Sequence, residues 1–375
     1  MQKKLLALAV AGALVPAAAM AQSSVEIYGR FNLGFDTWKA TGSAGGAATD
    51  FESRVRVVDG SSRLGFRINE SLGGGLRAFG VMESGVNVDA GGTSGQGGQT
   101  NGSSGTFATR DSYVGLGGGW GDVRLGRQSI WWSNGALAQV GANYFYTGAD
   151  SLITGHMVAP PVTRQSSVIS YNTPTMGGFN ASISFSPHDQ EGADAGAEAD
   201  GSIFGITGRY TGGALRAQID WAKNEGNTVA GVQSERKGLK MGLGWAYAPG
   251  AQISGIFGNL ENSANALGAD AEVNFWLVNW EHMMGQFLLV AQLYKAGDVE
   301  TSAGDVDDSD VTGITLGAKY FLSKRTGVYV AYHTARNGDF AWADHTGGAI
   351  TSGPLTVANR GADPRMLGVG VMHNF

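Results

Sequence analysis

Short runs of alternating apolar and polar residues dominate the chain. The clearest run covers 25–35, where apolar residues fall on one face and polar or charged residues on the other. The same period of two residues recurs at 179–186 and at 367–375. This period predicts β-strands that have one apolar and one polar face. Residues 273–280 are apolar on both faces, which predicts a strand that also packs against another part of the protein.

The strand-like runs are joined alternately by short and long connections. Seven are short and mostly Gly-rich, at 71–75, 117–121, 174–178, 212–213, 249–250, 285 and 323–325. Eight are long and mostly polar, at 39–60, 89–105, 131–163, 188–201, 226–235, 262–269, 297–310 and 337–362. Seven turns and eight loops join about sixteen strands. Short turns at one rim, long loops at the other and an even strand number are typical of outer-membrane barrels.

The predicted fold is therefore all-β, a transmembrane antiparallel β-barrel of about sixteen strands. A closed sheet of this kind satisfies its backbone hydrogen bonds within the membrane. A barrel of this width encloses an aqueous channel, whereas a barrel of eight strands is filled by its own side chains. The terminal Phe375 falls on the apolar face, which predicts a place in the interfacial aromatic girdle and a role in barrel assembly.

The third long connection, 131–163, is the segment that departs most from the strand pattern. A loop of this length inside a compact domain is usually functional. The segment holds a single acid, and it contains no Lys or Arg. Because the segment is too apolar to extend into water, we predict that it folds inward and narrows the lumen as a constriction loop. Its candidate residues are Trp131, Trp132, Tyr144, Phe145, Tyr146 and Asp150.

The first residues have the pattern of a secretory signal peptide. Lys3 and Lys4 precede an apolar core, and the triplet at 19–21 is an A-x-A cleavage site. We expect a cleaved signal at 1–21 and one barrel domain at 22–375, located in the bacterial outer membrane. No later window is long and apolar enough for a transmembrane helix.

Composition and charge exclude several classes of function. The chain has no Cys, so a disulfide scaffold is excluded. The formal charge is −6, and removal of Lys3 and Lys4 with the signal takes it to −8, so we expect no nucleic-acid partner. The 6 His are scattered without the spacing of a metal site or a hydrolase, so no enzyme, metal or cofactor is expected. The acidic run 305–310 lacks the Gly and the terminal acid of a calcium loop, which favours a solvated external loop over a site for divalent cations.

Six arginines are candidates for the lining of the lumen. Alternation places Arg30, Arg63, Arg67 and Arg77 on the polar face, and Arg110 and Arg164 flank the constriction loop in sequence. Guanidinium groups are always charged and bind anionic groups well, so a wall of them would attract anions. The alternative is that each Arg pairs with an acid such as Glu26, Glu83 or Asp111 and only braces the barrel. Strict alternation places Arg110 on the apolar face, so that position requires a bulge or an environment away from lipid.

Five stretches match a family pattern. They are GSSRLGFRINESLGGGL at 60–76, RDSYVGLGGGWGDVRLGRQ at 110–128, RQSSVISYNTPTMGGF at 164–179, FLSKRTGVYVAYH at 321–333 and LGVGVMHNF at 367–375. Together they span the chain from the first strands to the last. In this combination the sequence resembles the trimeric general porins of β-proteobacterial outer membranes.

The resemblance implies a homotrimer of sixteen-stranded barrels, in each of which the third loop faces an arginine cluster. By motif position the cluster corresponds to Arg63, Arg110 and Arg164, which implies a preference for anions. The chain departs from the family at Ser71, where an acid is usual, and at Met176, where an aromatic residue is common; both lie in short turns. The single acid of the loop leaves little counter-charge opposite the arginines.

The expected function is a water-filled channel for passive diffusion of small hydrophilic solutes, with a preference for anions. The alternative is a substrate-specific porin whose loop aromatics form a stacking track for sugars or organic acids, although such aromatics more often anchor a loop to the wall. A surface adhesin with a filled barrel would need large inward side chains, and the many inward Ser, Asn and Gly oppose it. Outer-membrane lipid and lipopolysaccharide are the other expected partners.

Overall fold

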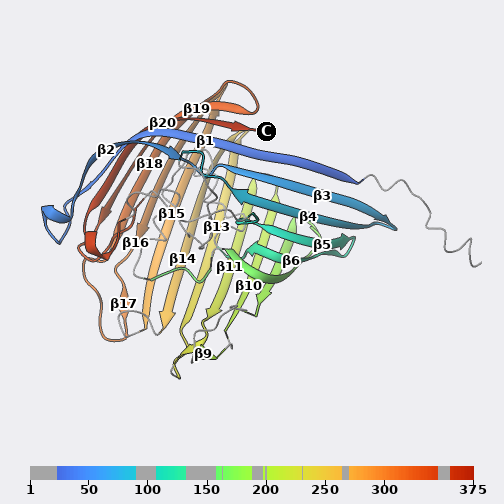
Figure 1. Ribbon diagram of the computed structural model, residues 1–375, viewed down its shortest axis with the longest axis horizontal. Helices are drawn as coiled ribbons and strands as arrows, with labels where there is room; N and C mark the ends of the chain where they lie inside the picture. Colours follow the sequence, from blue (N-terminus) through green and yellow to red (C-terminus); the bar gives the residue numbers. More distant parts are fainter. Residues whose placement is uncertain are drawn as a thin grey trace, which may run out of the picture.

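The computed structural model describes residues 23–89, 107–131, 158–162, 164–187, 197–198, 201–229, 231–263, 270–344 and 355–375. These residues form one large barrel-shaped sheet, shown in Figure 1, and a small two-stranded sheet of 197–198 and 228–229. The predicted signal peptide at 1–21 lies outside the described residues. So do Trp132, Tyr144, Phe145, Tyr146 and Asp150 of the predicted constriction loop.

Strands make up most of the described structure. In chain order they are β1 (Ser24–Thr41), β2 (Phe51–Asp59), β3 (Arg63–Gly73), β4 (Leu76–Gly85), β5 (Ser112–Gly118), β6 (Gly121–Ser129), β7 (Arg164–Asn172), β8 (Phe179–Ser186), β9 (Ala197–Glu198), β10 (Ser202–Gly212), β11 (Leu215–Glu225), β12 (Thr228–Val229), β13 (Glu235–Ala248), β14 (Ala251–Ser263), β15 (Ala271–Met284), β16 (Phe287–Ala296), β17 (Glu300–Thr301), β18 (Val311–Phe321), β19 (Thr326–Asn337) and β20 (Asp363–Asn374). Short 3-10 helices, η1 (Ala47–Thr49) and η3 (Val357–Asn359), lie in two of the long connections. Within the described ranges, no helix has the length and hydrophobicity needed to cross a membrane.

The main sheet closes on itself through antiparallel pairs. β1 pairs with β20 along one edge and with β2 and then β3 along the other, so β2 and β3 act as one stave of the barrel. The two-residue β17 pairs with β15 beyond the end of β16, so β16 and β17 also act as one stave. The 18 strands of the described sheet therefore form a closed barrel of 16 staves, which confirms the predicted fold.

The lengths of the connections alternate as predicted, with one error. Short turns join β3 to β4, β5 to β6 and the following hairpins at one rim, and long segments connect the staves at the other. The predicted loop at 39–60 is wrong, because β1 continues to Thr41 and Phe51 already begins β2. Residues 51–59, which the prediction assigns to the loop, form β2. Inside the barrel, Arg56 lies 2.9 Å from Asp36 in a buried ion pair that belongs to the inner face of the strands.

Side chains alternate between the outer surface and the interior of the barrel. In β20, Leu367 and Val369 are 53% and 52% exposed, whereas Met366 and Met372 are buried. An outer apolar band and a more polar interior are the pattern expected of a barrel wall in lipid.

β15 is apolar on its inner face as well. Val273, Phe275 and Leu277 are buried inward, in a hydrophobic cluster that also contains Trp131 and Val158 from the ends of the third long connection. Contact with this connection accounts for the apolar character of both faces of the strand.

The end of the chain takes part in closing the barrel. The N–H of Gly29 donates to the carbonyl oxygen of Phe375 at 3.1 Å, and the N–H of Phe375 donates back to Gly29 at 3.1 Å. The Phe375 ring lies 5.3 Å from the ring of Phe31, measured between centroids. These contacts continue the register of β20 against β1.

Candidate pore constriction

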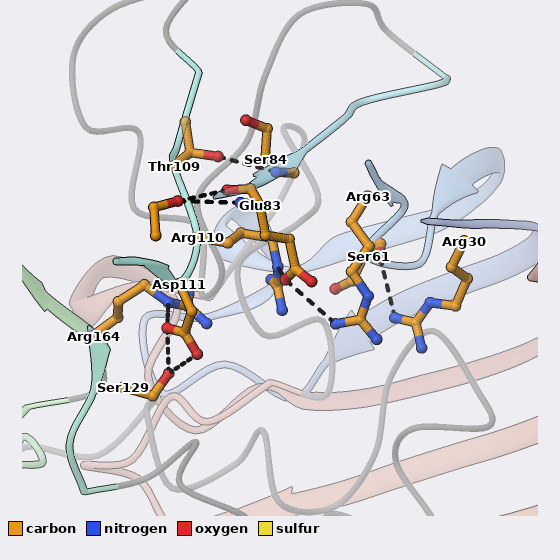
Figure 2. Close-up of polar contacts among 12 residues, drawn as sticks. Arg30, Ser61, Arg63, Glu83, Ser84, Thr109, Arg110, Asp111, Ser129 and Arg164 are labelled. Carbon is orange, nitrogen blue, oxygen red and sulfur yellow. Dashed lines mark hydrogen bonds and ion pairs between the residues drawn. The ribbon is translucent and has the colours of Figure 1, made fainter. Parts of the chain in front are cut away.

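Four of the six predicted arginines lie together on one part of the inner wall. Arg30 belongs to β1, Arg63 begins β3, Arg164 begins β7, and Arg110 lies just before β5 (Figure 2). Arg30 and Arg63 are register partners across the two neighbouring strands. Two guanidinium groups on directly opposed positions concentrate positive charge on this side of the lumen.

Glu83 of β4 holds two of these arginines. Its carboxylate accepts a hydrogen bond from Nε of Arg110 and lies 3.9 Å from Nη1 of Arg63. The hydroxyl of Tyr28 donates to the same carboxylate at 2.9 Å. One negative charge is thus shared by two guanidinium groups, which fixes their positions without cancelling their combined charge.

Asp111 holds the next arginine along the wall. Nε of Arg164 donates to Oδ1 of Asp111 at 2.7 Å, and the hydroxyl of Ser129 donates to the same oxygen at 2.9 Å. Because Asp111 follows Arg110 in sequence, this ion pair adjoins the one at Glu83, as Figure 2 shows. We call Arg30, Arg63, Arg110 and Arg164, with the two carboxylates between them, the arginine row.

Arg30 stands at the end of the row and is held by backbone. Its Nη2 donates to the carbonyl oxygens of Gly60 and Ser61 at 3.3 and 3.1 Å. These carbonyls lie at the bend between β2 and β3, where Ser61 has a φ of 66°. A carbonyl accepts from the guanidinium without neutralising it, so these two contacts leave the positive charge in place.

Arg110 lies outside the strand alternation altogether. β5 begins only at Ser112, and the backbone N–H of Arg110 donates to the carbonyl of Glu83 at 2.9 Å. Alternation therefore applies from Ser112 onward, and the conflict that strict alternation raises at Arg110 is resolved without a lipid-facing charge.

Arg67 and Arg77 lie apart from the row, nearer the short turns. Nη1 of Arg67 is 3.4 Å from Oε1 of Glu26, and Nη2 of Arg77 is 3.8 Å from Oδ2 of Asp122. Both arginine side chains are about half exposed, at 52% and 47%. Alternation identifies the face on which these residues lie, but it does not give their height along the strand, so it does not separate Arg67 and Arg77 from the other four.

Two further cations lie near the row, and the sequence analysis missed both. Nε of Arg127 donates to the carbonyl of Thr109 at 3.1 Å, beside a bulge in β6 that removes Arg127 from regular alternation. Lys319 lies on the inner face of β18 and interacts electrostatically with Arg30. Because Ile314 faces outward, alternation along β18 places Lys319 on the inner face, and this signal is present in the sequence.

The described ends of the third long connection reach the far wall. Trp131 is fully buried, and its carbonyl accepts a hydrogen bond from Nζ of Lys240 at 2.6 Å. At the other end, the carbonyl of Pro161 accepts from Nδ2 of Asn224 at 2.7 Å. β11 and β13, which carry these two donors, lie across the sheet order from β3. Both ends of the segment therefore lie against the wall opposite Arg30 and Arg63.

A buried ion pair supports this attachment. Nζ of Lys240 lies 3.6 Å from Oδ2 of Asp220, and both side chains are 1% exposed. Thr207 and Gln218 donate to the same carboxylate at 2.7 and 2.6 Å. Sequence reasoning did not single out this pair, although alternation in β11 and β13 places both residues inward.

Comparison with known proteins identifies the family. Residues 7–339 match the family described as Gram-negative porin. Outer membrane porin protein 32 of Delftia acidovorans is 29% identical over 383 residues, which cover 100% of each chain. The major outer membrane protein P.IB of Neisseria lactamica is 31% identical over 350 residues, which cover 88% of this chain and 92% of that protein.

Solved structures give the same result. The anion-selective porin from Comamonas acidovorans has a TM-score of 0.73 at 26% identity, over 94% of this chain and 100% of that chain. The trimer form of OmpT from Vibrio cholerae has a TM-score of 0.66 at 14% identity, over 94% of this chain and 99% of that chain, which shows the shared fold. With its closed barrel and these relatives, the chain belongs to the Gram-negative porin family and is an outer-membrane porin rather than an enzyme.

Proposed function

We propose that this porin is a channel for passive diffusion of small hydrophilic solutes and that it prefers anions because of the arginine row. The observation that carries the proposal is the arrangement of the row itself. Arg63 and Arg110 share the carboxylate of Glu83, Arg164 pairs with that of Asp111, and Arg30 lies beside them on backbone carbonyls.

The effect of this arrangement depends on the width of the lumen. A low-dielectric wall focuses the field of its charges on a passing ion. At about 0.1 M salt that field extends roughly 10 Å. The row therefore selects only where the lumen is narrow.

We propose that the segment 131–163 supplies the narrow region. Its two described ends are attached to the wall opposite Arg30 and Arg63, through Lys240 and Asn224. Trp131 lies two residues after β6 and Pro161 three residues before β7, so both contacts are made close to these strands. The proposed constriction requires that the residues between them face the arginines. Trp132, Tyr144, Tyr146 and Asp150 remain the candidates for the rest of the constriction.

The family relationship also supports a homotrimer. OmpT of Vibrio cholerae, which has the same fold, is known in a trimer form. We propose the same state for this chain. In such an assembly each barrel keeps its own pore, because each barrel is closed independently.

The structure favours the general porin over a substrate-specific one. Trp131, the aromatic of the constriction loop that lies within the described residues, is fully buried against the wall, and the Lys240 ammonium lies 4.6 Å from its ring centre. A residue in this position anchors the loop and offers no face to a passing sugar.

Reversal potentials under a KCl gradient test the proposed selectivity. We expect single channels of the purified protein to show a reversal potential of anion-selective sign. Replacing Arg63 and Arg164 together by Gln should reduce or abolish that preference, because half of the guanidinium groups of the row are then neutral. The matched control is Arg67→Gln with Arg77→Gln, which removes the same charge from the same barrel wall but outside the row.

The two double variants distinguish selection of anions by the arginine row from an effect of the net charge of the barrel. An equal shift in both variants would show that selectivity comes from net charge and not from the row. A cation-selective wild type would overturn the role of the arginines while leaving the barrel intact.

A further inference from the structure

Three residues of the inner wall lie at neighbouring positions on three strands, beside the arginine row. Tyr28 of β1 is the register partner of Gly65 of β3, and Gly65 is the register partner of Glu83 of β4. These three positions therefore share one level of the wall, with Gly65 in the middle. We call Tyr28, Gly65 and Glu83 the tyrosine bridge.

The side chain of Tyr28 crosses the middle strand to reach Glu83. Its hydroxyl donates to Oε2 of Glu83 at 2.9 Å, although neighbouring strands are about 4.8 Å apart and Glu83 is two strands away. A Cβ atom at Gly65 would lie 2.6 Å from the Tyr28 hydroxyl oxygen and closer still to Cζ of its ring. The crossing is therefore possible because position 65 has no side chain.

The bridge assigns different partners to the two oxygens of the Glu83 carboxylate. Oε2 accepts from Tyr28, whereas Oε1 faces Arg110 and Arg63. The Glu83 side chain is 12% exposed and that of Arg63 is 27% exposed. Both oxygens are thus engaged within the wall, and the negative charge is covered more completely than the positive charge of Arg63.

We propose that Tyr28 is a positioning residue of the anion filter, which holds Glu83 against the wall and keeps its negative charge away from passing ions. Hydrogen bonds to a carboxylate are strong and directional, so the hydroxyl fixes the direction of Oε2. Without this donor Oε2 loses its partner in the wall, and the carboxylate turns toward the water of the lumen to recover one. This role rests on the proposed function, in which the arginine row selects anions, and it lets a carboxylate lie within the row with little loss of anion preference.

Tyr28→Phe tests this role because it removes only the hydroxyl. The ring stays, together with its contact to Arg67, whose guanidinium carbon lies 3.7 Å from the ring centre. Single channels in a dilute KCl gradient should show the chloride-to-potassium permeability ratio lowered about twofold or more, since an exposed carboxylate attracts cations at close range. The matched control is Tyr113→Phe, which removes a hydroxyl of the same wall outside the row, 3.5 Å from Nη1 of Arg124. It should leave the ratio close to that of wild type.

Gly65→Ala perturbs the bridge at its middle position. The added Cβ displaces the Tyr28 ring, so the permeability ratio should fall as it does in Tyr28→Phe. Gly115→Ala is the control, because a Cβ there also meets an aromatic ring of the same wall, that of Phe79, which lies outside the row. Heat-sensitive mobility in gels reports folding of every variant, and if one bridge variant fails to fold, the other provides the test.

A double variant distinguishes positioning of Glu83 from a general structural effect. If Tyr28 acts through Glu83, Tyr28→Phe should change nothing further in the Glu83→Gln background, where no negative charge remains to be covered. A fall of the same size in that background would overturn the role, as would a wild-type ratio in Tyr28→Phe or an equal fall in Tyr113→Phe. A cation-selective wild type would instead contradict the row as an anion filter, and the differences between each variant and wild type would still decide the role of Tyr28.

Discussion

At the scale of single residues, the arginines of the lumen both brace the wall and retain excess charge. The sequence left pairing with acids and selection of anions as alternatives. In the structure Glu83 serves Arg63 and Arg110 at once, and backbone carbonyls hold Arg30. Because one carboxylate serves two guanidinium groups, bracing the wall does not cancel the positive charge of Arg63 and Arg110.

Glu83 is therefore expected to moderate selectivity as well as to position its partners. Replacing Glu83 by Gln keeps a hydrogen-bond acceptor between the two arginines but removes a negative charge. We expect the reversal potential in a dilute KCl gradient to move further in the anion direction. The shift should fade near 1 M KCl, where the screening length is about 3 Å.

Glu26→Gln is the matched control for Glu83→Gln. Glu26 pairs with Arg67 outside the row, in an exposed position. It should have a smaller effect on the reversal potential. A shift of Glu83→Gln in the cation direction would mean that loss of arginine positioning outweighs the gain in charge.

At the scale of elements, the third long connection depends on attachments made by the far wall. Trp131 is buried beside Lys240, and Lys240 is in turn held by Asp220. A segment fixed at both described ends has fewer conformations than its length implies, which would lower the entropic cost of the proposed constriction.

Trp131→Ala should release one end of this segment. We expect larger and noisier single-channel currents, because the segment then samples positions away from the wall, while the β-sheet signal in circular dichroism is unchanged. Trp120→Ala is the control, since Trp120 is exposed and stacks on Tyr171 outside the lumen. Steady currents of wild-type size from Trp131→Ala would contradict the anchoring role.

Sequence patterns predicted the barrel well because each stave must present an apolar face to lipid, which leaves a strict period of two. They could not predict which inward residues pair between neighbouring strands, or contacts made by irregular backbone. The pair of Lys240 and Asp220 is formed by neighbouring strands that alternation treats separately, and Arg127 is displaced by a bulge. Arg56 falls within the predicted loop at 39–60, and the sequence does not show that its charge is paired with Asp36 inside the barrel.

At the scale of the whole molecule, stability depends on the seam between β1 and β20. A Cβ atom added at Gly29 would lie 2.6 Å from the carbonyl oxygen of Arg63 and 2.4 Å from the Phe375 ring. The backbone of Arg63 and the ring of Phe375 therefore leave no room for a side chain at position 29.

Gly29→Ala is accordingly expected to impair closure of the barrel. Folding into lipid vesicles, followed by the heat-sensitive mobility of the folded form in gels, should show a lower folded fraction than in wild type. Gly255→Ala is the control, because a Cβ there meets one atom, the carbonyl oxygen of Leu277, at 3.8 Å. Equal folded fractions in the two variants would show that the seam tolerates the displacement.

The same seam also sets an order of events. Arg30 pairs with Asn374, so the strand that begins the sheet is completed by the strand that ends it. Contacts between such distant parts of a chain form slowly. Until β20 arrives, β1 keeps a row of unsatisfied backbone groups, a template for pairing with another chain. A polypeptide that lacks β20 therefore exposes an unpaired sheet edge that can pair with other chains. We expect every newly made chain to need protection from such pairing until β20 is in place.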